Sequence, residues 1–362
     1  MKIGVPKEVK NNEYRVGLSP ESVRELIKNN HEVYIQKDAG AEIGFDNEQY
    51  KNAGASIIDT AEKLYQSSEL IIKVKEPIPE EFKYLNEKHT VFAYLHLAGN
   101  PKTALELAAT GITGIALETV TADDGSMPLL SPMSSIAGQL SIVVGSYHLL
   151  KPNKGMGTLI GAIDDVEKRV VTVIGAGVAG TMAIEKAINN KAHLKIIDLS
   201  QKRLDELRSI YGESDIEYIV STDSTIEAAL KESDLVIGAV YVIGKQAPKV
   251  VKNSMLKKMK PGAVMVDISI DQGGCFESSK PTTHDNPTYE QDRIIHYCVT
   301  NMPGAVPLTA TQALNRATLP YILELANKGV EQALNDNNHL ANGLNIKTYE
   351  IVHDAVKEAL NV

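Results

Sequence analysis

Short apolar runs alternate with segments of helical periodicity along the first third of the chain. The strand-like runs are Lys2–Val5, Val33–Gln36, Leu70–Lys75, Thr90–Leu95 and Ile112–Val120. Helical patterns lie between them, as at Pro20–Asn29, where Ser19 is a candidate N-cap and Pro20 suits the first turn. Strands separated by helices predict a parallel sheet with both faces covered.

Two longer helical patterns divide the rest of the chain. One covers Pro132–Leu150, and the other covers about 308–327, where Pro320 is expected to bend it. Further strand-like runs lie between them, near 217–220, 234–241, 262–269 and 294–299. The tail, Val330–Val362, is expected to be helical.

This order predicts an α/β protein of two doubly wound parallel-sheet domains, one inserted into the other. The first domain is expected to comprise residues 1–128 plus 308–362, and the inserted domain residues 129–307. A cleft between the two sheets would be a natural place for a small substrate.

The segment 170–180, VVTVIGAGVAG, is the most informative stretch of the chain. A buried strand precedes Gly175, Gly177 and Gly180, a helix follows, and the next strand ends at Asp198. In the dinucleotide-binding pattern the first glycine makes the turn, the second admits the pyrophosphate and the third lets the helix lie on the strand. A carboxylate at Asp198 can accept both ribose hydroxyls and repel a 2′-phosphate. The pattern predicts a Rossmann-like NAD site, and the alternative is an ordinary glycine-rich turn.

Composition narrows the class of protein. With 362 residues, 43% of them hydrophobic and 23% charged, the chain has the make-up of a soluble globular protein. A net charge of −9 argues against nucleic acid or an anionic membrane as the main partner. No apolar run approaches the length of a membrane span, and the start lacks a signal-peptide core. Two cysteines suit a reducing cytoplasm and offer no metal cluster.

Four ionisable residues follow predicted strands, where ligands of open α/β sheets bind. Arg15 lies in the loop after the first strand, Lys75 ends ELIIKVK, His96 ends TVFAYLH and Asp271 follows AVMVDISI. The two cations could hold an anionic carboxylate, and the imidazole could move protons near neutral pH. The set is therefore suited to proton-coupled chemistry on a small acid.

Each of these residues also has a structural interpretation. Lys75 could be a solvated strand end, His96 a structural histidine and Arg15 one of many exposed cations. Asp271 has a rival in Asp267, and either carboxylate could simply hold loop amides. A further candidate, Cys275, is expected to be an inert buried thiol, because no cationic partner is evident near it.

Eight blocks of sequence carry a resemblance to a known family. In chain order they are PKEVKNNEYRVGLSP, IIKVKEP, LHLAG, MPLLSPMS, VIGAGVAG, DLVIGAV, KPGAVMVDISIDQGGCFE and CVTNMPGAVP. Together they closely resemble NAD-dependent alanine dehydrogenase, over residues 1 to about 326. The family also includes the nucleotide-binding part of proton-translocating transhydrogenase.

The resemblance implies reversible oxidative deamination of L-alanine to pyruvate and ammonium, with NAD as cofactor and no metal. By this resemblance Arg15 and Lys75 would bind the substrate carboxylate, His96 would be the general acid/base, and Asp271 would position water. The implied cofactor contacts are Ser134, Gly175, Gly177, Val178, Ala179, Gly180, Asp198, Arg203, Ser221, Val240, Ile268, Ser269, Ile270, Lys280, Val299, Asn301 and Met302. The family further suggests a cytoplasmic homohexamer.

Two other functions compete with this interpretation. A nucleotide-handling module of transhydrogenase would leave Lys75, His96 and Asp271 without a substrate. An opine- or saccharopine-type dehydrogenase would use a similar two-domain cleft, but the first 100 residues fit the alanine enzyme closely.

Overall fold

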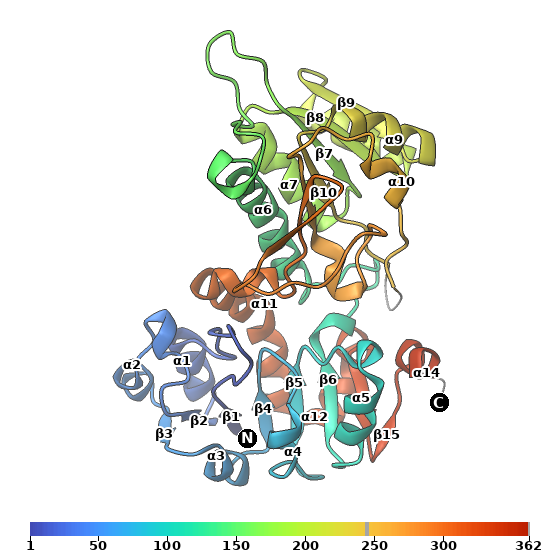
Figure 1. Ribbon diagram of the computed structural model, residues 1–362. Coiled ribbons are helices and arrows are strands. Elements are labelled where there is room, and N and C mark those ends of the chain that lie inside the picture. Colours follow the sequence, from blue (N-terminus) through green and yellow to red (C-terminus); the bar gives the residue numbers. More distant parts are fainter. Residues whose placement is uncertain (243–245, 361–362) are drawn as a thin grey trace. The chain divides into compact units, whose positions relative to one another are not determined.

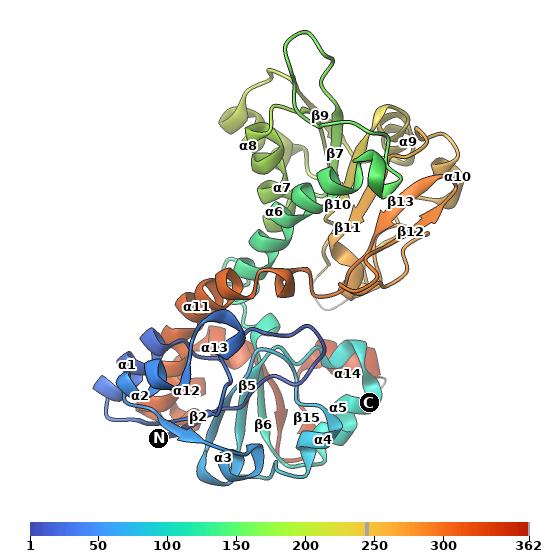
Figure 2. The same ribbon diagram turned by 60° about the vertical axis from the view of Figure 1, so that its left-hand side comes forward.

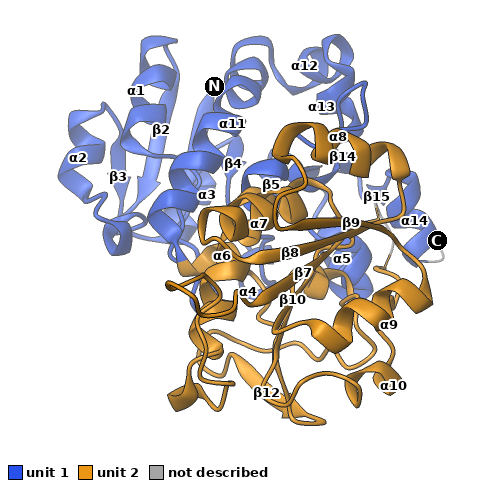
Figure 3. Ribbon diagram, turned by 90° about the horizontal axis from the view of Figure 1, so that it is seen from above, with its two compact units in different colours: residues 1–133, 306–362 blue, residues 134–305 orange. Residues whose placement is uncertain are grey.

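The computed structural model describes residues 1–242 and 246–360 and contains two compact units, coloured separately in Figure 3. Unit 1 comprises Met1–Met133 and Val306–Val362, and unit 2 comprises Ser134–Ala305. The chain therefore leaves unit 1, completes unit 2 and returns, and both termini belong to unit 1 (Figure 1). The boundaries expected from the sequence lie within a few residues of these.

Unit 1 is built on an eight-stranded sheet. Its strands are β1 (Lys2–Val5), β2 (Glu32–Gln36), β3 (Ser56–Ile58), β4 (Leu70–Ile72), β5 (Thr90–Ala93), β6 (Thr113–Ala116), β14 (Leu344–Lys347) and β15 (Glu350–Ile351). They lie in the order β15-β14-β6-β5-β4-β1-β2-β3. The first six strands along the chain pair in parallel, and β14 joins β6 antiparallel.

Helices lie on either side of this sheet (Figure 2). They are α1 (Pro20–Lys28), α2 (Asn47–Asn52), α3 (Ala61–Ser67), α4 (Pro79–Phe82), α5 (Pro101–Ala108), α11 (Pro307–Lys328), α12 (Val330–Asp336), α13 (Asn338–Asn342) and α14 (Asp354–Leu360). Short 3-10 helices cover Ala41–Ile43, Leu97–Gly99 and Leu117–Thr119. The expected cap of α1 is confirmed, because the Ser19 side chain accepts the Ser22 N–H at 3.2 Å.

Unit 2 contains a seven-stranded sheet. Its strands are β7 (Val170–Ile174), β8 (His193–Asp198), β9 (Ile216–Val220), β10 (Leu235–Gly238), β11 (Val264–Asp267), β12 (Thr288–Gln291) and β13 (Ile294–Tyr297). Their order is β12-β13-β11-β10-β7-β8-β9, with only β12 antiparallel among the described strands. The helices are α6 (Ser131–His148), α7 (Val178–Asn189), α8 (Gln201–Tyr211), α9 (Asp223–Glu232) and α10 (Asn253–Leu256), with 3-10 turns at Lys151–Asn153, Ile268–Gln272 and Met302–Ala305.

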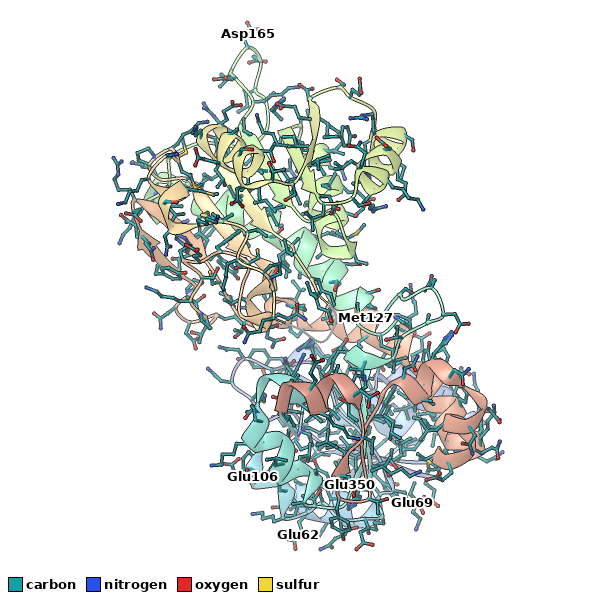
Figure 4. All side chains as sticks on the ribbon, turned by 90° about the vertical axis from the view of Figure 1, so that its right-hand side faces the viewer. Glu62, Glu69, Glu106, Met127, Asp165 and Glu350 are labelled. Atoms are coloured by element: carbon teal, nitrogen blue, oxygen red, sulfur yellow. The ribbon has the colours of Figure 1, made fainter. Side chains whose placement is uncertain are left out.

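Both faces of the sheet of unit 2 are buried. Val171 and Val173 of β7 belong to one apolar cluster, whereas Ile174 belongs to another. Alternate residues of one strand thus enter different cores, as expected for a parallel sheet between two helical layers. Part of the segment 154–169 extends beyond these layers and carries Asp165 at its tip (Figure 4), whereas Ile160 of the same segment is buried in the first cluster.

The two sheets share one topology. Without their antiparallel edge strands, both run 3-2-1-4-5-6 in chain order, which is the doubly wound arrangement expected from the sequence. The order reverses between β1 and β4 in unit 1, and between β7 and β10 in unit 2. Ligands of such sheets bind beyond the carboxyl ends of the strands at this reversal.

Parts of the sequence prediction are wrong. The tail is not helical throughout, because β14 and β15 form an antiparallel hairpin on the edge of β6. The strand-like runs ending at Lys75 and Leu95 stop earlier, since β4 ends at Ile72 and β5 at Ala93. Helix α11 contains Pro320 without interruption, and the bend expected there stays a prediction. In the described part of the chain, no helix is long and apolar enough to cross a membrane.

Candidate active site

The three glycines after β7 meet different surroundings. Gly175 has φ +96°, and a Cβ there would lie 2.6 Å from the carbonyl oxygen of Ala239. At Gly180 a Cβ would lie 1.8 Å from the oxygen of Gly175, so only glycine lets α7 approach the turn this closely. A Cβ at Gly177 would meet no atom within 4 Å. The fold therefore requires the first and third glycines, whereas the space at the second fits the pyrophosphate of a dinucleotide.

Asp198, the last residue of β8, lies against this turn. Its Oδ2 accepts the N–H of Ala176 at 2.7 Å, and its Oδ1 accepts the N–H of Ser200 at 2.8 Å. Arg203 donates from Nε to the carbonyl of Ala176 at 3.0 Å and from Nη2 to Thr181 Oγ1 at 2.9 Å. The structure thus brings both expected ribose-side residues to the glycine turn, with the half-buried carboxylate held in place by backbone amides.

Most of the other expected cofactor contacts lie beyond the carboxyl ends of parallel strands. Val178 and Ala179 begin α7 after β7, and Ser269 donates to the Val240 carbonyl at 2.7 Å, joining the segments after β10 and β11. The remaining members of this group are Ser221, Ile268, Ile270, Val299, Asn301 and Met302.

Two expected contacts are placed differently. Ser134 lies in the first turns of α6. Lys280 is exposed, its backbone N–H donates to the hydroxyl of Tyr289 at 2.9 Å, and its Nζ lies 5.6 Å from that ring. The structure ties Lys280 to Tyr289 and not to the carboxyl end of a parallel strand.

Asp267 organises the loop after β11. It is fully buried and accepts hydrogen bonds from the N–H of Ser269 (2.9 Å) and Cys275 (2.8 Å) and from Ser279 Oγ (2.5 Å). Burial raises the pKa of its carboxyl against the lowering effect of these bonds. These contacts support a structural role for Asp267. Asp271 is exposed on the following 3-10 turn, where it is open to solvent.

Cys275 matches the inert interpretation. Its side chain is fully buried, with Sγ 3.5 Å from Asp267 Oδ1, and burial raises the pKa of the thiol well above its ordinary value. A thiol of this kind is a poor nucleophile.

In unit 1, Arg15 follows β1 and is buried, with 2% of its surface exposed. The interpretation of Arg15 as an exposed cation is therefore wrong. Its Nε and Nη2 form a fork on the carboxylate of Glu13, at 2.6 and 2.5 Å, and Nη1 lies 3.2 Å from Met133 Sδ. Glu13 compensates the charge of the guanidinium, which the sequence did not indicate.

Lys75 and His96 follow β4 and β5, next to the reversal of strand order. Lys75 is half-buried. The ring of His96 stacks on Tyr94, with centroids 5.9 Å apart and planes 15° apart. Partial burial of the ring, then the positive charges of Lys75, Lys10 and Arg15, hold the pKa of His96 well below its ordinary value. The structure therefore brings Arg15, Lys75 and His96 into one electrostatic environment, with the imidazole neutral at neutral pH.

Glu118, which the sequence did not indicate as a site residue, contacts the backbone of His96. Its carboxylate accepts the N–H of His96 at 2.6 Å and that of Leu95 at 3.2 Å, and lies 4.0 Å from His96 Nδ1. His96 has the unusual φ of +48°, so these bonds hold a strained residue in place. Burial raises the pKa of Glu118 to about 7. The only available signal was a lone acid in the apolar run GIALETV.

A dinucleotide turn in one doubly wound unit, and two cations with a neutral imidazole in another, define a two-domain nucleotide-dependent oxidoreductase. Models of the two domains of alanine dehydrogenase/PNT match residues 4–137 (N-terminal domain) and 141–354 (C-terminal domain). The chain belongs to the alanine dehydrogenase/PNT family, as the eight sequence blocks predicted, and the cofactor of this family is NAD.

Curated relatives match over the full length. The chain is 47% identical to an alanine dehydrogenase of Halomonas elongata and 48% identical to one of Staphylococcus haemolyticus, covering 100% of this chain and 97% of each relative. A solved L-alanine dehydrogenase is 44% identical, with a TM-score of 0.95 and coverage of 100% and 99%. A transhydrogenase from Sinorhizobium meliloti, 23% identical over 98% of this chain and 100% of its own, shares the fold with a TM-score of 0.83.

Proposed function

We propose that the chain is an NAD-dependent L-alanine dehydrogenase. In this reaction L-alanine, NAD⁺ and water give pyruvate, ammonium, NADH and a proton, reversibly. The full-length identity to relatives of that name supports the reaction. The observation in the molecule that carries the proposal is the group Arg15, Lys75 and His96 at the strand-order reversal of unit 1.

The substrate carboxylate is held by Arg15 and Lys75. Because Glu13 already compensates Arg15, the excess positive charge comes from Lys75, which also faces the carbonyl oxygen of pyruvate. An ammonium beside that oxygen stabilises the negative charge that develops on it. Fixing the carboxylate also orients the α-carbon for transfer.

His96 is the general acid/base. Its lowered pKa keeps the imidazole neutral, so that it can take a proton from the ammonium group of alanine and free the amine lone pair. The iminium formed after hydride loss is attacked by water, which Asp271 positions. The carbinolamine then releases ammonium as protons return to nitrogen and leave oxygen. Each positioned acid/base group can contribute about 10²–10⁴-fold.

The residues at the strand ends of unit 2 would hold the cofactor. NAD bound there would accept the hydride from the α-carbon. Asp198 and Arg203 contact the adenosine ribose, and the Asp198 carboxylate disfavours a 2′-phosphate. The phosphate-side residues would be Ser134, Gly177, Val178 and Ala179, and Ser221 would lie near the adenine. The nicotinamide side would be lined by Val240, Ile268, Ser269, Ile270, Val299, Asn301 and Met302, and Lys280 would lie near the cofactor.

We also propose the domain roles, location and assembly. Residues 1–128 plus 308–362 bind the substrate, residues 129–307 bind NAD, and the enzyme is a cytoplasmic homohexamer. Exposed apolar side chains on the segment 154–169, namely Leu159, Ile163 and Val166, are of the kind that subunit interfaces cover. Light scattering coupled to gel filtration measures the assembly, and a monomer would contradict it.

The test of function follows NADH absorbance. L-alanine with NAD⁺ should raise it, and pyruvate with ammonium and NADH should lower it. Lys75→Met should abolish both changes, whereas Lys63→Met, an exposed lysine on α3, should leave them unaltered. If neither change occurs but NADH reduces a second nicotinamide cofactor, the chain is a transhydrogenase module.

A further inference from the structure

A buried ammonium lies two residues before Lys75. The side chain of Lys73 has no exposed surface, and its Nζ lies 3.2 Å from Glu8 Oε2 and 3.1 Å from Glu81 Oε1. Both carboxylates are also buried, with 2% and 7% of their side chains exposed. The three residues come from the loop after β1, the end of β4 and helix α4. Neither the acids nor Lys73 has a part in the proposed chemistry.

Glu8 connects this ammonium to the backbone of Lys75. While Oε2 pairs with Lys73, Oε1 accepts the N–H of Val74 at 2.6 Å and that of Lys75 at 3.3 Å. The carboxylate thereby joins the loop after β1 to the segment after β4. These are the two connections that flank the strand-order reversal of unit 1 and that carry Arg15 and Lys75.

Glu81 fixes the other end of the same segment. Its Oε2 accepts the N–H of Ile78 at 2.9 Å, and its Oε1 accepts the hydroxyl of Tyr65 at 2.8 Å together with Lys73 Nζ at 3.1 Å. Residues 74–78 are thus held at both ends by carboxylates that share one ammonium. Lys75 lies within this clamped segment.

The ammonium of Lys73 and the carboxylates of Glu8 and Glu81 shift one another's pKa. Burial acts against the ammonium of Lys73, but Glu8 and Glu81 outweigh it and raise its pKa. Burial also raises the pKa of Glu8, opposed by Lys73 and reinforced by Glu13 and Glu81. Without Lys73, two buried carboxylates would face each other uncompensated, and removing one member of such a group is strongly destabilising. Removing a charge together with its partner avoids most of that cost.

We propose that Lys73 is a positioning residue for the substrate side of the active site. Its single positive charge lies between Glu8 and Glu81 and reduces their mutual repulsion, so that both carboxylates can hold the segment presenting Lys75. Lys73 does not itself touch the substrate. This inference rests on the proposed function for its kinetic part. Lys73 then stabilises the segment from within the fold, and Lys75 binds the substrate.

Four variants test the proposal. They are Lys73→Met, Lys73→Met combined with Glu8→Gln and, as controls, Lys75→Met alone and Lys75→Met combined with Glu8→Gln. Lys73→Met, assayed below its unfolding temperature, should raise the KM for pyruvate at least tenfold and leave the KM for NADH within twofold. The double variant of Lys73 and Glu8 should recover part of the loss, since the repulsion between the two acids is gone and the Gln amide oxygen still accepts from Val74 and Lys75, while Glu81 alone remains without its ammonium. The Lys75→Met enzyme should not be rescued by Glu8→Gln.

Hydrogen exchange supplies a readout that needs no turnover. In the parent, the amides of Val74 and Lys75 should be protected; in Lys73→Met they should exchange at least tenfold faster, and in the double variant they should return toward the parent rate. Unchanged exchange in Lys73→Met, a pyruvate KM within twofold of the parent, or a double variant as impaired as the single one would overturn the proposal. An inactive parent that shows the expected exchange pattern would instead overturn only the proposed function.

Discussion

The glycine turn after β7 allows two matched substitutions with opposite consequences. In Gly180→Ala the new Cβ must move by about 1.2 Å, from 1.8 Å to the 3.0 Å that real Cβ atoms respect, and it faces a backbone oxygen that cannot rotate away. Overpacking of this kind costs about 3 kcal/mol, and the better helix propensity of alanine returns about 1 kcal/mol. The variant should therefore lose about 2 kcal/mol of stability.

Gly177→Ala should behave differently. Gly177 has φ −70° and ψ −161°, which alanine adopts freely, and its Cβ would meet no protein atom. The free energy of unfolding should change by less than about 1 kcal/mol, because the restriction of the unfolded chain is opposed by the poorer fit of alanine at the N-cap of α7. If the space is kept for the pyrophosphate, NADH affinity should fall at least about tenfold, or ~1.4 kcal/mol.

Urea unfolding followed by circular dichroism measures the first effect, and the fluorescence of bound NADH measures the second. The chain contains no tryptophan, so the NADH signal is not obscured by indole emission. An unchanged unfolding midpoint in Gly180→Ala would refute the packing argument. NADH affinity that is unaltered in Gly177→Ala would show that the open space at this turn is not where the phosphates bind.

Three further predictions concern ionisable groups. Asp198→Asn keeps one acceptor oxygen and turns an NH2 group toward the second loop amide, so it should lose about 1 kcal/mol of stability. It should also lose discrimination against NADPH by about tenfold. Steady-state kinetics with both cofactors would show this, and retained discrimination would exclude Asp198 from the ribose contact. His96→Ala should lower turnover by about 10²–10⁴-fold while NADH affinity stays within twofold, and near-normal turnover would remove His96 from its role. Because burial raises the pKa of Glu118 from 4.5 to about 7, its stabilising contribution is complete below pH 4.5 and is lost as the pH rises to 7. Glu118→Gln should abolish this loss of about 3 kcal/mol in urea unfolding between pH 4 and 8, and an unchanged pH dependence would contradict the assignment.

The helices and strands that were predicted correctly are those whose caps, prolines or β-branched runs all lie within a few neighbouring residues. Helix α1 has its cap and its proline, and β7 has a continuous β-branched run. The missed strand β14 has no such signal, because LNIK is short and half polar. It forms because β6, more than 200 residues earlier, offers an open edge, and because Ile346 packs over Gly114, where a Cβ would lie 3.1 Å away. Because the pairing partner of β14 is so distant along the chain, the residues of β14 and their neighbours do not indicate a strand.

The charged residues of unit 1 illustrate the same limit at the site. Lys73 and Lys75 occupy alternate positions, and in a continuing strand their side chains would share one face and one environment. The strand ends at Ile72, so this alternation no longer applies, and one ammonium is buried between two acids while the other is half-exposed. Similarly, Arg15 gave no sign that Glu13 would take its fork. Position after a strand identified the loops that carry these cations. The environment of each cation is decided by the carboxylates that pack against it, which lie in the same loop for Arg15 and on other elements for Lys73.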